Sequence, residues 1–374
     1  MKKKYQNLFF IFGLAVLIIM VSQLNFKEVI AGISNAGYWF FAVVLLWVFL
    51  YMLNTAAWWI IIQSTAKPAG TTTVTTIAPP VSNKLPSAQS EQDECTQTLL
   101  PDGRLRLNLR NMTWIYCLTV SGFALNYATP GGLMGGEPYR IMSLKPVIGI
   151  ERATSSVVLY SMTHIFSHFW FWLLSIFLFL IIHRPTAAEV VMLAAIAAFC
   201  FLGLWFFFVG YRKGLAAKLL RAARHLPGLH KKMSSFINSH ETQINTIDSQ
   251  ISALHRQSTK TFVTAVLLEI LCRIASALEI FFILKVIMPH VCYADCLLIL
   301  AFTSFIANLL FFIPLQMGGR ESGFLMSATG LSMSTNAGIL VALIVRLREL
   351  IWVAVGLLLI KVSGRNTTPA NQHK

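Results

Sequence analysis

The amino-acid sequence predicts an all-α, polytopic membrane protein with about six transmembrane helices and two re-entrant hairpins arranged as an inverted repeat. The composition is 56% hydrophobic and 12% charged, with a mean hydropathy of +0.66, whereas soluble domains are about 25% charged. Several apolar runs reach roughly 20 residues, the length that crosses a hydrocarbon core about 30 Å thick. Two polar, glycine-rich segments interrupt such runs at matching places.

We expect six full spans, each an apolar run bounded by polar or charged residues. They cover residues 8–22, 38–62, 153–182, 190–209, 262–288 and 338–361. Lysines and arginines concentrate in the segments expected in the cytoplasm, which is the usual orientation signal of helical membrane proteins. The net charge of +15 therefore indicates topology, with both termini cytoplasmic, and not a nucleic-acid partner. Trp58 and Trp59, near the inner end of the second run, are expected at the membrane interface.

Residues 1–374 are thus expected to form a single integral membrane domain with two long cytoplasmic segments. Residues 67–110 are rich in Thr, Ser, Pro and Gln, a composition that buries too little apolar surface to order itself, so we expect a flexible loop there. Residues 211–260 form a basic connector. Its leucines recur at helical spacing, which fits both an amphipathic helix on the anionic inner leaflet and a solvated connector.

Two further apolar runs are not counted as full spans, because a polar, glycine-rich segment interrupts each of them. We call these two segments the breaks. The first lies near residues 126–140 and reads NYATPGGLMGGEPYR, and the second lies near residues 308–323 and repeats the order Asn, Pro, Gly-Gly, Glu. Charged segments on both sides of the first hairpin place its ends in the cytoplasm. Because a chain that enters and leaves on one side has to turn within the membrane, each break predicts a re-entrant hairpin.

The order of span, hairpin and span occurs twice. The first unit covers residues 38–182 and starts outside, and the second covers residues 262–361 and starts inside. Inverted repeats with broken helices recur in transport proteins, because one half can rock against the other around a fixed site. The two breaks together therefore predict a transport site.

The breaks carry residue types that suit an anionic ligand such as a phosphate. Glycines permit tight turns, a helix that starts after them presents free N–H groups, and arginine binds phosphate with two parallel hydrogen bonds. Each glutamate would meet a cationic part of the ligand or neutralise an arginine; alternatively, the glycines only allow packing and each glutamate caps its helix. The candidate substrate-binding residues are Asn126, Pro130, Gly131, Gly132, Gly135, Gly136, Glu137 and Arg140, and then Asn308, Pro314, Gly318, Gly319, Arg320 and Glu321.

Further charges lie inside predicted spans, where they are costly unless they face a cavity or one another. Glu269 and Arg273 are four residues apart and can pair on one helix, and the last span carries Arg346 and Glu349. We expect these four to form an intramembrane charge network, which is either part of a transport cycle or purely structural.

The sequence gives no sign of a metal, a cofactor or an enzyme active site. His164 and His168 are four residues apart and suit metal binding or proton transfer, but no third ligand stands at a recognisable spacing. Cys292 and Cys296 either pair or stay free. The sequence contains no nucleophile elbow, zinc-protease motif or phosphate loop, so we do not expect an enzyme.

The segment from Pro130 to Arg140, followed by the segment from Pro314 to Glu321, resembles the lysylphosphatidylglycerol synthase transmembrane family, also called flippase-like. Its best-known member is the multiple peptide resistance factor of bacteria. In that factor the membrane half moves aminoacylated phospholipid between leaflets, and a separate soluble domain transfers the amino acid from tRNA. The chain resembles the membrane half alone, so the resemblance does not imply aminoacyl transfer.

The resemblance implies a protein of the bacterial inner membrane that translocates an anionic or aminoacylated phospholipid, or another lipid-linked substrate, between leaflets. Two other functions stay open: a membrane-embedded transferase or hydrolase acting on a lipid-linked substrate, and a non-catalytic scaffold for an envelope-synthesis enzyme. The partners expected are therefore the lipid and the membrane, with a homo-oligomer or an envelope-synthesis enzyme as further candidates.

Overall fold

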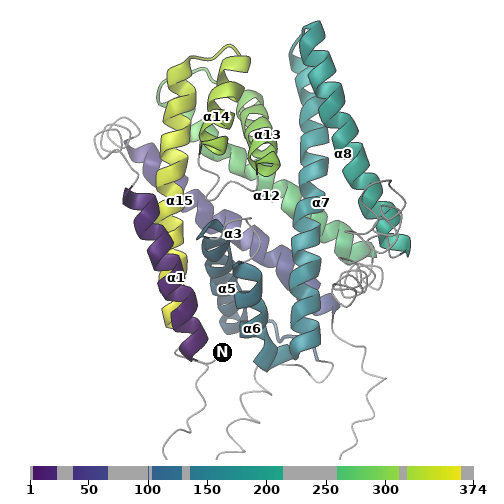
Figure 1. Cartoon of the computed structure of the whole chain (residues 1–374), viewed down its shortest axis with the longest axis vertical. Coiled ribbons are helices and arrows are strands. Elements are labelled where there is room, and N and C mark those ends of the chain that lie inside the picture. Colours follow the sequence, from purple (N-terminus) through teal and green to yellow (C-terminus); the bar gives the residue numbers. More distant parts are fainter. Residues whose placement is uncertain are drawn as a thin grey trace, which may run out of the picture.

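The computed structural model describes residues 3–22, 37–65, 100, 103–128, 135–213, 259–310 and 318–363, and these residues form helices and no strand (Figure 1). The all-α class predicted from the sequence is confirmed for this part of the chain. The helices are α1 (Lys3–Ser22), α3 (Tyr38–Ser64), α5 (Leu109–Ala128), α6 (Gly136–Ile148), α7 (Ile150–Ile182), α8 (Ala187–Lys213), α12 (Thr259–Lys285), α13 (Tyr293–Leu309), α14 (Gly319–Gly330) and α15 (Thr335–Ser363).

Three of these helices are long and apolar enough to cross a membrane: α3, α7 and the part of α8 at Ala187–Phe207. The helices α12 and α15 are as long, at 27 and 29 residues, but they carry several charged side chains in their interiors. The apolar stretch of α1 is shorter, at Tyr5–Ala15. The count of six spans therefore stays a prediction for α1, α12 and α15.

Each polar break separates two short helices that pack against each other. The first pair is α5 and α6 and the second is α13 and α14, and Figure 1 shows the two pairs toward opposite ends of the molecule. The connecting residues, 129–134 and 311–317, lie outside the described residues. The re-entrant path of each hairpin therefore stays a prediction, whereas the interruption of both helices is a feature of the structure.

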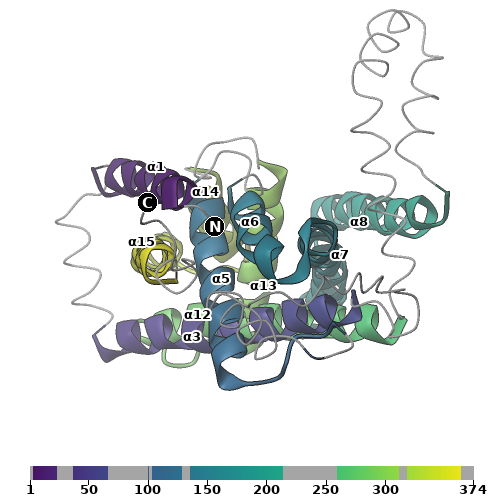
Figure 2. The same cartoon turned by 90° about the horizontal axis from the view of Figure 1, so that it is seen from below.

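The packing of the first unit recurs in the second. The helices α3 and α12 lie against each other along one side of the molecule (Figure 2). The hairpin α5–α6 packs against α15 through α5, and the hairpin α13–α14 packs against α7 through α13; α6 also contacts α7, and α14 contacts α15. The helices α3, α5, α6 and α7 of the first unit thus correspond, in this order, to α12, α13, α14 and α15 of the second. When each helix is replaced by its counterpart, a pair of helices in contact becomes another pair in contact.

Local sequence signals explain where several helices begin and end. Gly149 has a φ of 80° and lies between α6 and α7, a backbone conformation that glycine adopts without steric cost. Glu151 follows in the first turn of α7, where a negative charge complements the helix dipole. Pro185 follows the other end of α7 and separates it from α8, because proline cannot continue a helix.

Trp58 and Trp59, which were expected at the membrane interface, are covered by other helices, and their depth in the membrane stays a prediction. Their exposed fractions are 0% and 8%, and both belong to the core formed by α3, α5, α6, α7 and α15. The Trp58 ring lies 6.0 Å from the ring of Tyr160 on α7. Tertiary packing therefore covers both indoles.

Most of the two long cytoplasmic segments expected from the sequence falls outside the described residues. The flexible loop was expected at 67–110 and the basic connector at 211–260. Cys292 and Cys296 lie within the described part and are free thiols, the first exposed and the second buried.

Candidate functional site

The start of α14 is shaped by the glycines of the second break. Gly318 has a φ of 77° and precedes the first turn of the helix. The backbone N–H of Gly318 donates to Glu321 Oε2 at 2.9 Å, so the carboxylate caps the helix that contains it. The capping alternative considered for Glu321 is therefore present in the structure.

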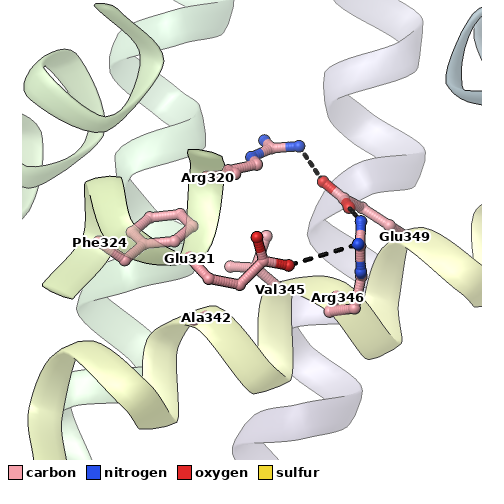
Figure 3. A pocket seen from close by; sticks show the side chains of 7 residues that line it. All are labelled: Arg320, Glu321, Phe324, Ala342, Val345, Arg346 and Glu349. Atoms are coloured by element: carbon pink, nitrogen blue, oxygen red, sulfur yellow. Dashed lines mark hydrogen bonds and ion pairs between the residues drawn. The ribbon is translucent and has the colours of Figure 1, made fainter. Parts of the chain in front are cut away.

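Arg320 and Arg346 bring two guanidinium groups together beside this helix start (Figure 3). Arg320 on α14 forms an ion pair with Glu349 on α15. Arg346 lies 3.4 Å from Glu321 and 3.7 Å from the other oxygen of Glu349. Glu349 is only 1% exposed, whereas Arg320 and Arg346 are 21% and 16% exposed. The buried carboxylate thus holds two arginines that remain partly accessible.

These four side chains line a shallow pocket with about 160 Å³ of empty space, open solvent included. Phe324, Ala342 and Val345 complete its lining. No part of this space is wide enough to enclose a water molecule, so in this state the site is a shallow depression that a lipid headgroup enters only if the side chains move. We call Arg320, Glu321, Arg346 and Glu349 with this pocket the α14–α15 site.

A second buried charge pair lies next to this site. Arg348 on α15 donates two hydrogen bonds, at 2.8 and 3.0 Å, to the carboxylate of Glu279 on α12. The indole N–H of Trp47 donates to the same carboxylate at 3.0 Å, and the Arg348 guanidinium lies 3.9 Å from the centre of the Trp47 ring. Arg348 is 1% exposed. The pair therefore links α3, α12 and α15 inside the bundle.

The first break positions its residues differently. Asn126, near the end of α5, accepts a hydrogen bond from the backbone N–H of Gly136 at 2.7 Å and donates to Glu137 Oε1 at 3.2 Å. A Cβ atom at Gly136 would overlap the backbone carbonyl of Gly122, so only glycine allows α5 and α6 to approach this closely. Ser161 on α7 also donates to Glu137 Oε1, at 3.3 Å.

Arg140 does not present its charge at the break. It is 1% exposed, and its Nη2 donates to the carbonyl of Thr119 at 3.1 Å. Its guanidinium lies 4.9 to 5.5 Å from the ring centres of Phe123, Trp58 and Tyr160. Arg140, a candidate substrate-binding residue in the sequence, is in this state a buried core cation, and the cations beside the pocket are Arg320 and Arg346.

A third group of charges, the α7–α12 cluster, consists of His164, His168, Glu269 and Arg273. His164 Nδ1 lies 2.8 Å from Glu269 Oε2. Arg273 is 3.6 Å from the same carboxylate oxygen and donates to the carbonyl of His164 at 2.8 Å. The rings of His164 and His168 are 5.2 Å apart.

The expected charge network thus divides into two groups. Glu269 and Arg273 form the pair expected at a spacing of four residues and belong to the α7–α12 cluster. Arg346 and Glu349 pair on α15 and belong to the α14–α15 site. The helix α12 belongs to the first group through Glu269 and reaches the second through Glu279, because Arg348, the partner of Glu279, lies 3.9 Å from Glu349.

The remaining candidates are placed as follows. Gly135 and Gly136 start α6, and Gly319 starts α14. Asn308 is exposed and donates to the carbonyl of Ser304 at 2.7 Å, so it does not cap α14 in the way that Asn126 caps α6. Pro130, Gly131, Gly132 and Pro314 lie outside the described residues. Within the described ranges, His, Cys, Asp and Glu form no group of three that is arranged to hold a metal.

The sequence did not identify Trp47 and Tyr127 as site residues. Trp47 binds Glu279, and Tyr127, next to Asn126 at the end of α5, lies beside the Arg320 guanidinium. Tyr127 therefore brings the end of the first interrupted helix to the start of the second. The signal that could have identified Tyr127 from the sequence is its position directly after Asn126, a candidate site residue.

The fold and these buried charge groups define a multi-helix integral membrane protein with two interrupted helical hairpins and an arginine-lined pocket. The chain belongs to the lysylphosphatidylglycerol synthase transmembrane family: the family model described as "Lysylphosphatidylglycerol synthase TM region" matches residues 95–356, which is most of the chain. No curated protein and no solved structure matches it. Membership confirms the resemblance found in the sequence and implies a lipid-related role in the membrane.

Proposed function

We propose that this protein translocates a lipid with an anionic headgroup, such as a phospholipid, between the leaflets of the bacterial inner membrane, and that both termini are cytoplasmic. The observation that carries the proposal is the α14–α15 site. Arg320 and Arg346 stand partly exposed beside an interrupted helix, and the carboxylates of Glu349 and Glu321 occupy their donors. Intramembrane charges of this kind mark the path of a polar substrate.

The chemistry of the site suits a phosphate. A guanidinium group binds carboxylate and phosphate with the same two-point geometry. Two phosphate oxygens can therefore take the place of the carboxylate of Glu349 or Glu321 as hydrogen-bond acceptors of a guanidinium group, and the arginine itself does not have to change. The carboxylates hold the arginines in the empty state, because an unpaired buried charge is costly. The apolar tails would remain in the bilayer, so the pocket has to receive only the polar end of the lipid.

The arrangement of the helices supports alternating access. The neighbour pairs of α3 to α7 recur in α12 to α15, as expected if two similar units rock against each other around a site between them. Tyr127 beside Arg320 joins the ends of the two interrupted helices. A movement of either hairpin would therefore change the surroundings of Arg320 and open the pocket to the headgroup.

The test is a leaflet-exposure assay with the purified full chain in liposomes that carry fluorescently labelled phosphatidylglycerol and an impermeant quencher. The wild type is expected to expose all of the label, whereas protein-free vesicles expose only the outer half. A double variant, Arg320→Gln with Glu349→Gln, removes the cation and its buried counter-charge together and is expected to lose at least about tenfold in rate, the effect of about 1.4 kcal/mol on a barrier.

Arg184→Ala is the matched control, because it removes an exposed arginine from the turn between α7 and α8 and should leave the rate unchanged. If the double variant matches the wild type, the α14–α15 site is not the translocation site. If no lipid in a broad panel moves and mass spectrometry finds a new lipid product, a transferase or hydrolase replaces the proposal. If neither movement nor product is seen, the scaffold remains.

A further inference from the structure

The proposed function does not use the α7–α12 cluster, yet this cluster has the properties of a proton-binding site. His164 and Glu269 are in hydrogen-bonding contact at 2.8 Å, and their side chains are 26% and 1% exposed. The histidine can therefore exchange a proton with its surroundings, whereas the carboxylate that stabilises the charged histidine is fully enclosed. Histidine is the side chain that changes charge near neutral pH.

Two buried side-chain atoms of the α7–α12 cluster, His168 Nδ1 and Glu269 Oε1, have no hydrogen-bond partner. Among the described residues, six buried side-chain atoms lack a hydrogen-bond partner, and four of them belong to Glu137, Arg140, His168 and Glu269. Glu269 Oε1 is one of them, although Glu269 Oε2 is bound by His164 and Arg273. Such atoms are costly inside a protein. The unsatisfied carboxylate oxygen and imidazole nitrogen of this cluster are atoms of the kind that can accept a hydrogen bond or a proton.

We propose that the His164–Glu269 pair binds one proton in each translocation cycle and that the protein moves this proton together with the anionic lipid. This inference rests on the proposed function. In the unprotonated state His164 Nδ1–H donates to Glu269, as the contact with an ionised carboxylate requires. The proton then binds at Nε2 and leaves from Nε2, so the imidazole becomes an imidazolium and returns to the neutral form, and Glu269 stays ionised.

The charges around His164 favour this direction of coupling. One carboxylate, Glu269, and one guanidinium, Arg273, contact His164, so the formal charge of this group is zero when His164 is neutral and +1 when it is protonated. A bound anionic lipid stabilises the added positive charge of the proton inside the membrane. Because coupling between two ligands is reciprocal, the bound proton strengthens binding of the anionic lipid by the same factor. The titratable or charged groups in contact with His164 or with Glu269 are Tyr160 and His168 of α7 and Cys272 and Arg273 of α12. On the side of α6, Arg140 stacks on Tyr160 and Glu137 accepts a hydrogen bond from Ser161.

The helix α12 connects the proton site with the lipid site. Glu269 contacts His164, and Glu279 on the same helix binds Arg348, the neighbour of Glu349 in the sequence. Ten residues of helix separate the two carboxylates by about 15 Å. A change in the charge of the His164–Glu269 pair therefore acts on a rigid element that also holds the cluster beside the pocket.

The test measures the steady-state distribution of labelled phosphatidylglycerol between leaflets under an imposed pH gradient. The full chain is placed in liposomes with the membrane potential clamped to zero by potassium and valinomycin. If one proton moves with each lipid, a gradient of about one pH unit drives about a tenfold enrichment of the label in the leaflet facing the alkaline side. Reversing the gradient is expected to reverse the enrichment.

His164→Gln and Glu269→Gln are expected to abolish the enrichment. The matched control is His183→Gln, because His183 also faces a carboxylate, Asp295 at 3.2 Å, but lies outside the α7–α12 cluster, and it should keep the enrichment. Wild-type protein that equilibrates the label equally in both leaflets, or enriches it on the acidic side, overturns the proton inference and leaves the proposed function standing. Wild-type protein that moves no label overturns both.

Discussion

At the scale of single residues, the site depends on which neighbours a side chain can reach. Arg320 and Glu321 are adjacent in the sequence, and one of the expected roles of the glutamate was to neutralise an arginine. Adjacent residues of a helix point in different directions. Arg320 therefore pairs with Glu349, and Glu321 pairs with Arg346 while it caps α14. The residue types were predictable, whereas their partners on α15 depend on how two helices pack.

The close approach of α5 and α6 gives a prediction about Gly136. Gly136→Ala is expected to lower the free energy of unfolding by about 1–3 kcal/mol, the usual cost of overpacking, because the new Cβ would overlap the rigid carbonyl of Gly122. Thermal unfolding of the purified protein in detergent measures the effect. Gly330→Ala is the control, since a Cβ at Gly330 meets no atom within 4 Å, and an equal loss in both variants would contradict the packing argument.

The role of Arg140 could not be predicted from the pattern of neighbouring residues. Its place after the glycines favoured a ligand-binding role, but in the structure its guanidinium lies among three aromatic rings. Arginine stacks on aromatic faces as readily as it binds anions. The choice between these roles depends on Trp58 and Tyr160, which are 82 and 20 residues away in the chain, so no local pattern could have decided it.

At the scale of helices, apolar runs with polar ends gave accurate boundaries. The second span was expected at 38–62 and α3 covers Tyr38–Ser64; the fifth was expected at 262–288 and α12 covers Thr259–Lys285. A long apolar run in a membrane protein forms a helix because the backbone groups have no other partner there. The breaks near 126–140 and 308–323 were also located from their glycines and prolines, since the helices on either side end and begin within these ranges, and the path of the chain through them stays a prediction.

The buried ion pair between Glu279 on α12 and Arg348 on α15 gives a prediction about stability. Arg348→Met leaves the carboxylate of Glu279, which is 5% exposed, without its bidentate partner and is expected to cost about 3–5 kcal/mol. Adding Glu279→Gln removes the stranded charge and keeps an acceptor for the Trp47 indole, so the double variant should recover most of the loss. Thermal unfolding of the single and double variants measures both effects.

A loss that is the same in the single and the double variant would contradict this account. It would mean that Arg348 stabilises the bundle by packing alone, since its stem and its stacking on Trp47 are absent from both variants.

At the scale of the whole molecule, the inverted repeat predicts on which side of the membrane each loop lies. Cysteines introduced by Arg106→Cys and Glu151→Cys, before and after the first hairpin, should both react with an impermeant thiol reagent from the cytoplasmic side. The exposed Cys292 and a Ser334→Cys substitution, before and after the second hairpin, should both react from the outside. All of these positions are exposed in the structure, so access to the side chain does not limit the reaction.

Each variant is made in a background without the other cysteines, and a position that reacts in detergent serves as its own control for a competent thiol. If the two ends of one hairpin react from opposite sides, that hairpin crosses the membrane completely. The inverted-repeat topology would then be wrong, although the neighbour pairs seen in the packing would remain.

The contact between α1 and α15 has a consequence for how the protein is made. Gln6 donates to the carbonyl of Ile360 across a sequence separation of 354 residues, and Lys361 donates to Asn7 at 3.2 Å. At a synthesis rate of about 5–20 residues per second, α1 waits roughly 20–70 s for this partner. Its amide side chain needs other hydrogen-bond partners during that interval, while α1 itself can already pack against α5, so the last hydrogen bonds of the first helix form only when synthesis is nearly finished.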